Sequence, residues 1–243
     1  KAKMLCEGVN TTPEIEELFS KQNPFKVKRG GLSSGGKMKL AGTVQVNAPF
    51  YRNREIDLKL VSDPLNLNGF IVDYHGEFLC SGEVLKAPDW YKEMVSEFSI
   101  TQILTAHGKQ LAGAIYEDCS LFKIKEECKF CAINFSLKNK SPLLIRKKST
   151  LFLEAISKIS SNYYDGLALN GGMTMHQGRG MEIIEPVVCD INAVYPNLNI
   201  AVEITPPQDL IWIDKLKNAG VSSLMMNIEC WDDEIRKNVI PGK

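Results

Sequence analysis

The chain has 243 residues, and its 29 Lys and Arg are balanced by 29 Asp and Glu, so the formal net charge is zero. With 44% hydrophobic and 24% charged residues, the composition is that of an ordinary globular protein. The zero net charge argues against a nucleic-acid partner, and no run approaches the roughly 20 apolar residues that a membrane-spanning helix requires. These features favour a protein that acts on a small molecule, without a membrane partner.

Residues 1–105 are predicted to be a β-rich N-terminal region. Thr12 and Pro13, followed by acidic residues, predict a helix that runs to about Gln22. A glycine-rich stretch at 30–42 follows, and it does not fit the pattern of a phosphate-binding loop. Strands are expected around 43–46, 56–61, 70–74 and 77–79. A hairpin turn at His75-Gly76 is expected to join the last two.

Residues 106–243 alternate short apolar segments with helix-length amphipathic segments. Strands are expected at 111–116, 167–170, 199–204 and 222–228, with helices at 151–160, 181–194 and 208–218. This order predicts an α/β fold with parallel strands. A complete eight-stranded barrel needs about 200 residues or more. We therefore predict a partial or truncated (β/α) TIM-type barrel, with its open edge covered by chain beyond Lys243 or by a partner.

Three of the seven cysteines, Cys119, Cys128 and Cys131, lie close together in the sequence, directly after the first predicted parallel strand. Loops at the carboxyl ends of such strands carry the sites of α/β proteins. Three thiolates suit an iron-sulfur cluster or zinc, and they leave one metal position open. Three free thiols, or a structural zinc with a distant fourth ligand, remain as alternatives.

Other side chains carry weaker signals. Cys6, Cys80 and Cys189 are interpreted as buried thiols. His176, on the loop after the second parallel strand, is a candidate for facing a substrate. The basic residues between Lys138 and Lys148 are most simply a solvated surface, although they leave an RNA substrate open.

The cysteine loop resembles that of the radical S-adenosylmethionine (radical SAM) enzymes, in which an aromatic residue precedes the last cysteine, as Phe130 does in Cys128-Lys-Phe-Cys131. The common spacing in that superfamily is Cys-x3-Cys-x2-Cys, whereas eight residues separate Cys119 from Cys128. Longer first gaps occur in the superfamily. The chain therefore departs from the majority form of the motif.

A second segment, Gly171-Gly172-Met173, resembles the Gly-Gly-Glu segment that holds the ammonium group of S-adenosylmethionine in these enzymes. Met173 stands where the family has the acid. The resemblance implies that the carbonyls of Gly171 and Gly172 accept from the ammonium group. A plain Gly-Gly turn is the alternative.

The third and fourth parallel strands both lead to an acidic residue, Glu203 and Glu229. The resemblance implies that Glu229 holds the ribose hydroxyls and that Glu203 supports it or reaches the amino-acid end of the cofactor. It also implies that Arg236 pairs with the cofactor's carboxylate. Either acid could instead be the structural partner of a lysine. Residues 228–243 are similar to the biotin-synthase-like branch, and more narrowly to an uncharacterised branch found in nitrilase-associated gene clusters.

The resemblance implies a radical SAM enzyme with two cofactors, a [4Fe-4S] cluster and S-adenosylmethionine. Such an enzyme cleaves S-adenosylmethionine reductively to a 5′-deoxyadenosyl radical, which abstracts hydrogen from a small-molecule substrate. It takes electrons from a donor such as flavodoxin or ferredoxin. Thiolate ligands also imply a reducing compartment, the cytoplasm. A radical SAM enzyme that modifies RNA or a peptide, and a non-catalytic zinc-binding protein, are the alternatives.

Overall fold

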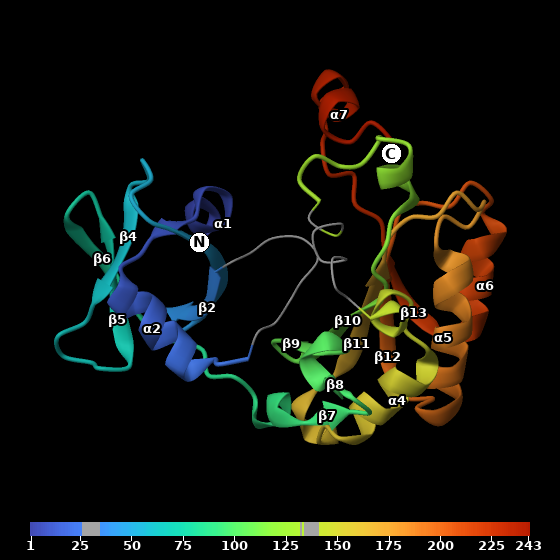
Figure 1. Ribbon diagram of the computed structural model, residues 1–243, viewed down its shortest axis with the longest axis horizontal. Helices are drawn as coiled ribbons and strands as arrows, with labels where there is room; N and C mark the ends of the chain where they lie inside the picture. Colours follow the sequence, from blue (N-terminus) through green and yellow to red (C-terminus); the bar gives the residue numbers. More distant parts are fainter. Residues whose placement is uncertain (26–34, 132, 134–140) are drawn as a thin grey trace. The chain divides into compact units, whose positions relative to one another are not determined.

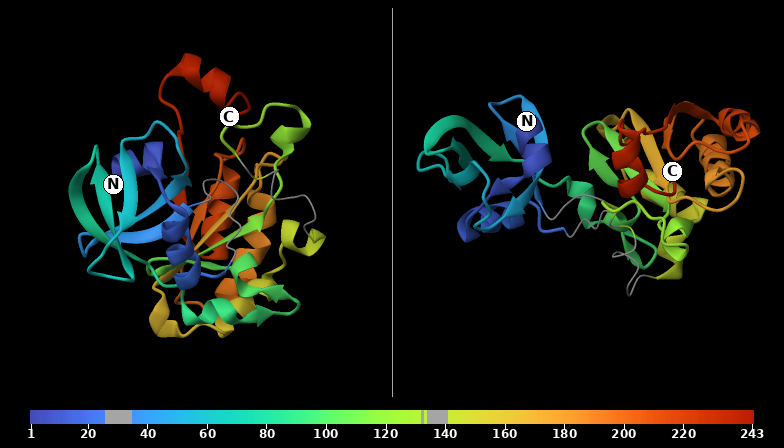
Figure 2. Two further views of the ribbon diagram at one scale, coloured as in Figure 1. Left: turned by 60° about the vertical axis from the view of Figure 1, so that its left-hand side comes forward. Right: turned by 90° about the horizontal axis from the view of Figure 1, so that it is seen from above.

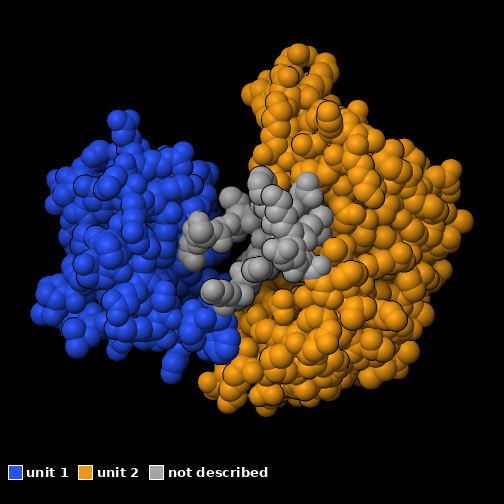
Figure 3. All heavy atoms as spheres, in the orientation of Figure 1, with its two compact units in different colours: residues 1–26, 32–88 blue, residues 27–31, 89–243 orange. Residues whose placement is uncertain are grey.

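A computed structural model describes residues 1–25, 35–131, 133 and 141–243. The chain divides into two compact units: residues 1–26 with 32–88, and residues 27–31 with 89–243 (Figure 3). The units therefore change over at residues 88–89, earlier in the chain than the boundary at 105–106 expected from the sequence. Part of the glycine-rich stretch, and Lys138 and Lys140 of the basic run, lie outside the described residues.

The first unit is a closed six-stranded β-barrel with the strand order β1-β3-β2-β6-β5-β4 (Figure 2). Its strands are β1 (Val9–Asn10), β2 (Gly35–Leu40), β3 (Val44–Tyr51), β4 (Leu58–Ser62), β5 (Gly69–Tyr74) and β6 (Glu77–Val84). Two helices accompany them, α1 (Ala2–Glu7) and α2 (Pro13–Gln22).

Two local predictions for this unit are confirmed. Helix α2 begins at Pro13, and the Thr12 side chain caps it by accepting a hydrogen bond from the backbone N–H of Ile15 at 3.4 Å. His75 and Gly76 connect β5 to β6 and both have positive φ, 55° and 87°, as a tight two-residue hairpin requires.

Strand β1 closes the barrel. It pairs in parallel with β3, through Val9 and Phe50, and with β4, through Asn10 and Lys59. The other described pairings in the barrel are antiparallel. The interior is a contiguous apolar core in which Val9, Met38 and Phe70 are fully buried. The exclusion of this apolar surface from water is what holds the small barrel together.

The second unit contains a five-stranded sheet with the order β13-β12-β11-β10-β9. Its strands are β9 (Thr105–His107), β10 (Gln110–Tyr116), β11 (Gly166–Gly171), β12 (Asn199–Glu203) and β13 (Val221–Met225). Strands β10 to β13 are parallel, and β9 runs antiparallel to β10. Helices α4 (Ser149–Ser157), α5 (Met181–Val194) and α6 (Ile211–Ala219) cover one face of this sheet (Figure 1).

The predicted partial TIM-type barrel is wrong. The parallel strands form an open sheet that ends in an antiparallel strand, and the closed barrel lies in the first unit instead. The alternation of strands and helices that led to the prediction is correct. Alternation, however, specifies a parallel sheet with crossover helices and not whether that sheet closes.

The remaining elements of the second unit are short. They are η1 (Asp89–Lys92), β7 (Met94–Val95), β8 (Phe98–Ser99), η2 (Ile100–Gln102), η3 (Ser120–Lys123), α3 (Pro142–Ile145), η5 (Ser161–Tyr163) and α7 (Asp233–Val239). Strands β7 and β8 pair with each other. In the part of the chain that the structure describes, every helix is too short or too polar to cross a membrane.

The two faces of the sheet differ in side-chain size. Leu111, Leu167 and Ile200 are paired neighbours on β10, β11 and β12, and all three are fully buried beneath the helices. Because side chains alternate along a strand, the next residues face the opposite side, where alanines predominate. At the carboxyl end of this second face, Asn170 lies beside Glu203 in the strand register. Small residues thus leave the backbone accessible where the polar side chains begin.

Candidate functional site

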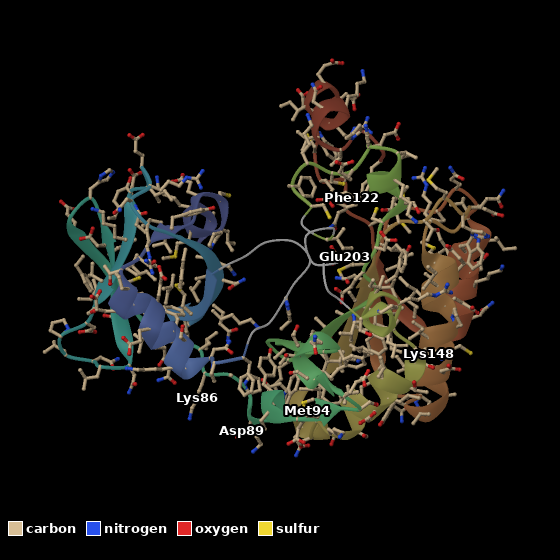
Figure 4. The ribbon with its side chains drawn as sticks, viewed as in Figure 1. Lys86, Asp89, Met94, Phe122, Lys148 and Glu203 are labelled. Atoms are coloured by element: carbon tan, nitrogen blue, oxygen red, sulfur yellow. The ribbon has the colours of Figure 1, made fainter. Side chains whose placement is uncertain are left out.

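The candidate site lies at the carboxyl end of the parallel sheet. Figure 4 labels Glu203 at the end of β12 and Phe122 on the loop that follows β10, both at this end of the sheet. Since the strands are parallel, the loops after β10, β11, β12 and β13 all emerge here. The predicted site residues fall on these four loops or at the strand ends that lead into them, except Arg236, which lies on α7 beyond β13.

An aspartate fixes the start of the cysteine loop. The Asp118 carboxylate accepts a hydrogen bond from the backbone N–H of Cys119 at 2.7 Å and another from the Tyr116 hydroxyl at 3.2 Å. The Lys123 ammonium lies 3.9 Å from the same carboxylate. Cys119 is therefore held in place by its own neighbours at the end of β10.

The three cysteines lie within electrostatic reach of one another. The backbone N–H of Cys131 donates to the carbonyl of Cys128 at 2.9 Å, which closes a tight turn. Burial raises the pKa of the Cys128 thiol, and the nearby Lys243 ammonium opposes this shift. Negative charge on Cys131 and Cys119 raises the Cys128 pKa further, as does that of the Glu229 carboxylate.

The cysteines do not form a ready-made metal site. Among the described residues, no three His, Cys, Asp or Glu side chains are grouped closely enough to hold a metal ion, which contradicts the metal-binding group expected from the cysteine loop. The donor chemistry nevertheless suits an iron-sulfur cluster, because three thiols share one loop. Cys119 and Cys131 are half-buried, and Cys128 is 7% exposed.

The Gly171-Gly172 segment packs directly on the cysteine loop. The backbone N–H of Gly172 donates to the carbonyl of Tyr116 at 2.8 Å, and that of Ser120 donates to the carbonyl of Met173 at 2.8 Å. A Cβ atom at Gly172 would lie only 1.8 Å from the Asp118 carbonyl oxygen. The absence of a side chain at Gly172 is therefore required for the two loops to meet.

The two predicted acids have different partners. The Asn227 side chain donates to the Glu203 carboxylate at 2.7 Å, so an amide holds this acid. The Lys243 ammonium lies 3.4 Å from the Glu229 carboxylate. A lysine partner, the alternative considered from the sequence, is thus present for Glu229. Glu229 also has a φ of 64°, which is uncommon for a residue other than glycine.

Arg236 lies on α7 and lines a cavity of about 410 Å³ in the second unit. Its guanidinium is 2.6 Å from the Asp233 carboxylate, an exposed pair one helical turn apart. The three cysteines, the two glycines, Glu203 and Glu229 are not among the residues that line this cavity. Phe130 is 55% exposed, so the aromatic residue of the motif is largely in contact with solvent.

The segment after α7 connects this cavity to the cysteine loop. The backbone N–H of Lys129 donates to the carbonyl of Val239 at 2.9 Å, and that of Gly242 donates to the carbonyl of Glu126 at 3.2 Å. Lys243 lines the cavity and also pairs with Glu229. The cavity and the cysteines therefore belong to one contiguous region.

Sequence reasoning missed the acid that organises the loop after β11. The Glu182 carboxylate accepts from the Thr174 hydroxyl at 2.5 Å and from the backbone N–H of Gly180 at 3.0 Å. The ring nitrogen Nδ1 of His176 lies 3.4 Å from the same carboxylate and accepts from the N–H of Gly178. An acid in the first turn of α5 was the available signal. His176 therefore has a structural role in this loop.

Two of the cysteines interpreted as buried thiols are exposed. Cys6 and Cys189 both face solvent, and Cys80 is half-buried. The prediction for Cys6 and Cys189 is therefore wrong. Apolar neighbours in the sequence indicate that a helix has a buried face, but they do not show whether a cysteine near the edge of that face is itself covered.

Tyr116 offers a test of the contacts around Cys119. Burial, together with the charge and hydrogen bond of Asp118, raises the pKa of Tyr116 from 10.0 to about 12. The raised value means that the neutral phenol stabilises the fold, and that this contribution is lost as the pH rises from 10 towards 12. The difference between tyrosinate absorbance titrations of the parent and Tyr116→Phe should show a midpoint near pH 12. Asp118→Asn should lower it, and a midpoint near pH 10 in the parent would contradict the described packing.

No family model, curated protein or solved structure matches this chain.

Proposed function

We propose that this chain is a radical SAM enzyme that acts on a small molecule. The observation that carries the proposal is the packing of the Gly171-Gly172 segment against a loop with three cysteines, Cys119, Cys128 and Cys131. Both segments lie at the carboxyl end of a parallel sheet, where α/β proteins bind ligands. The proposal rests on these contacts and on the sequence resemblance, and it needs no barrel.

The three cysteines would hold a [4Fe-4S] cluster, which, when bound, supplies the electron for reductive cleavage of S-adenosylmethionine and leaves an iron open for that cofactor. Asp118 contributes by fixing the backbone of Cys119. Burial of Cys128 keeps water from part of this region. The carbonyls of Gly171 and Gly172 are the acceptors for the ammonium group, and Phe130 lies within the cysteine motif.

The remaining cofactor contacts require two ion pairs to open. Glu229 would accept hydrogen bonds from the ribose hydroxyls once its ion pair with Lys243 has opened. Arg236 would bind the carboxylate of S-adenosylmethionine once its ion pair with Asp233 has opened. The Arg236–Asp233 pair is exposed, and such pairs contribute about 0–1 kcal/mol, so a charged ligand can displace it. Glu203 already accepts from Asn227 and would support the amino-acid end of the cofactor. An electron donor such as flavodoxin or ferredoxin completes the proposed system.

The test is made on the full chain, purified without oxygen. We expect a brown protein with visible absorbance bands that, once reduced, cleaves S-adenosylmethionine to 5′-deoxyadenosine. Cys119→Ala, Cys128→Ala and Cys131→Ala should each lose the absorbance and the cleavage, because three thiolates are needed to hold the cluster. Cys189→Ala removes an exposed thiol on α5 and should retain both.

Two results would contradict the proposal. A colourless protein with bound zinc would favour the non-catalytic alternative. Full cluster content in all three of the Cys119, Cys128 and Cys131 variants would show that these cysteines are not the ligands of the cluster.

A further inference from the structure

The cavity beside the cysteine loop combines apolar walls with basic side chains. Its volume, about 410 Å³, falls in the range of small-molecule sites, which is roughly 300–1,000 Å³. Pro206, Ile228, Trp231 and Ile240 form apolar parts of the wall. The basic side chains come from three different segments and are Arg179, Arg236 and Lys243.

Two of the three cations are already neutralised. Arg236 is paired with Asp233 at 2.6 Å, and Lys243 with Glu229 at 3.4 Å. The guanidinium of Arg179 has no ion pair or hydrogen bond with any residue in the described ranges. The cavity therefore presents one uncompensated positive charge. Because a partly buried charge gains from a partner of opposite sign, this charge favours an anionic ligand group.

The backbone of Arg179 is held in an uncommon conformation. Its φ is 49°, in the left-handed region that residues other than glycine rarely adopt. The Glu182 carboxylate fixes the loop on both sides of Arg179 through Thr174 and Gly180. Such conformations persist only where surrounding contacts impose them, and they gather at binding sites. The guanidinium is thus presented from a fixed loop.

We propose that this cavity binds a small organic monocarboxylate and that Arg179 binds its carboxylate group. One uncompensated charge matches a monoanion better than a phosphate dianion, and the planar guanidinium can bind a carboxylate through two hydrogen bonds. Trp231 is 85% exposed and lines the cavity, so an aromatic or apolar body of the ligand can cover it. The inference goes beyond the radical SAM proposal and does not require a cluster.

The experiment measures ligand binding to the full chain by tryptophan fluorescence and by calorimetry. Phenylacetate is the probe, and phenylacetamide, which has the same shape without the charge, is its matched control. Phenylacetate should bind the parent at least tenfold more tightly than phenylacetamide does. Arg179→Gln should weaken phenylacetate binding by about ten- to a hundredfold, the usual loss for hydrogen bonds to a charged group.

Matched variants isolate the role of Arg179. Arg179→Lys keeps the charge but loses the planar pair of donors, so it should bind phenylacetate with intermediate affinity. Lys217→Gln removes a positive charge from the exposed side of α6 and should bind as the parent does. Circular dichroism of Arg179→Gln and Arg179→Lys shows whether each variant is folded.

Three outcomes would overturn the inference. Equal phenylacetate affinity in the parent and in folded Arg179→Gln would remove Arg179 from the site, and equal affinity in folded Arg179→Lys would refute the paired hydrogen bonds from the guanidinium. Tighter binding of inorganic phosphate than of phenylacetate would show that the cavity prefers another anion. Weakened binding of S-adenosylmethionine in Arg179→Gln, without a change for phenylacetate, would assign Arg179 to the cofactor. Since the readout needs neither iron nor catalysis, its failure is distinguishable from a failure of the cysteine assignment.

Discussion

Replacing Lys147 by methionine is expected to cost the second unit about 3–5 kcal/mol of stability, the usual effect of removing one partner from a buried ion pair. The Lys147 side chain is fully buried, and its ammonium pairs with the Glu117 carboxylate and donates to the carbonyl of Ala114 at 2.8 Å. Methionine fills a similar volume but leaves the buried carboxylate without this cation. Thermal unfolding should show the midpoint lowered by roughly 6 °C or more.

Two further variants separate the ion pair from other effects of the change. Lys237→Met breaks an exposed pair with Glu234 and should leave the midpoint unchanged within error. Combining Lys147→Met with Glu117→Gln should recover part of the loss, because a neutral amide then stands where the buried carboxylate had lost its cation. A loss below about 1 kcal/mol in Lys147→Met would show that the pair contributes little.

Gly172→Ala is expected to destabilise the second unit by about 1–3 kcal/mol or more, as overpacking of a tight contact does. The added Cβ would lie 1.8 Å from the Asp118 carbonyl oxygen and 3.1 Å from the Cβ atom of Cys119. Backbone cannot yield as a flexible side chain does, so residues 118 and 119 must move. Thermal unfolding measures the cost, and iron content after reconstitution measures the effect on the proposed cluster.

The neighbouring glycine provides the control. A Cβ at Gly171 would meet its nearest atom, the Cβ of Tyr116, at 3.4 Å, which is an ordinary contact. Gly171→Ala should therefore leave both stability and iron content near those of the parent. If the two variants behaved alike, the close approach of Gly172 to the cysteine loop would be refuted.

Local signals in the sequence located the four parallel strands and the three longest helices of the second unit. Helix α5 runs from Met181 to Val194, as predicted, because its apolar residues recur with helical spacing over many turns. The helix expected at 208–218 corresponds to α6, which ends at Ala219 because Gly220, with a φ of 109°, caps it. These features depend on neighbours in the chain, and a single sequence contains that information.

Closure was predicted wrongly for the sheet of the second unit and was not predicted for the strands of the first, and both have the same reason. The open sheet was expected to be part of a barrel, and the N-terminal strands were not expected to close into one. Whether a sheet closes depends on pairings between residues far apart in the chain, such as Asn10 with Lys59. Hydrophobic periodicity describes each strand separately and carries no information on which strand lies beside it.

The site was predicted in part. The sequence indicated the residues on the loops after β10, β11, β12 and β13, because strand ends can be recognised locally. It did not indicate Asp118 or Glu182, whose contacts to backbone groups become visible only in three dimensions. Arg179 was also missed, because its significance comes from the lack of an ion-pair partner among the described residues and not from a motif.

The pairings of the two-residue strand β1 are expected to form late, because they join residues that are far apart in the sequence of the first unit. Hairpins such as β5–β6 bring together residues that are neighbours in the sequence, so their formation costs little loop entropy. Asn10, in contrast, has to find Lys59 across most of the unit before the barrel is complete. High contact order of this kind slows folding. During synthesis, β1 leaves the ribosome before β3 and β4, so its pairings with these two strands must wait until both have followed.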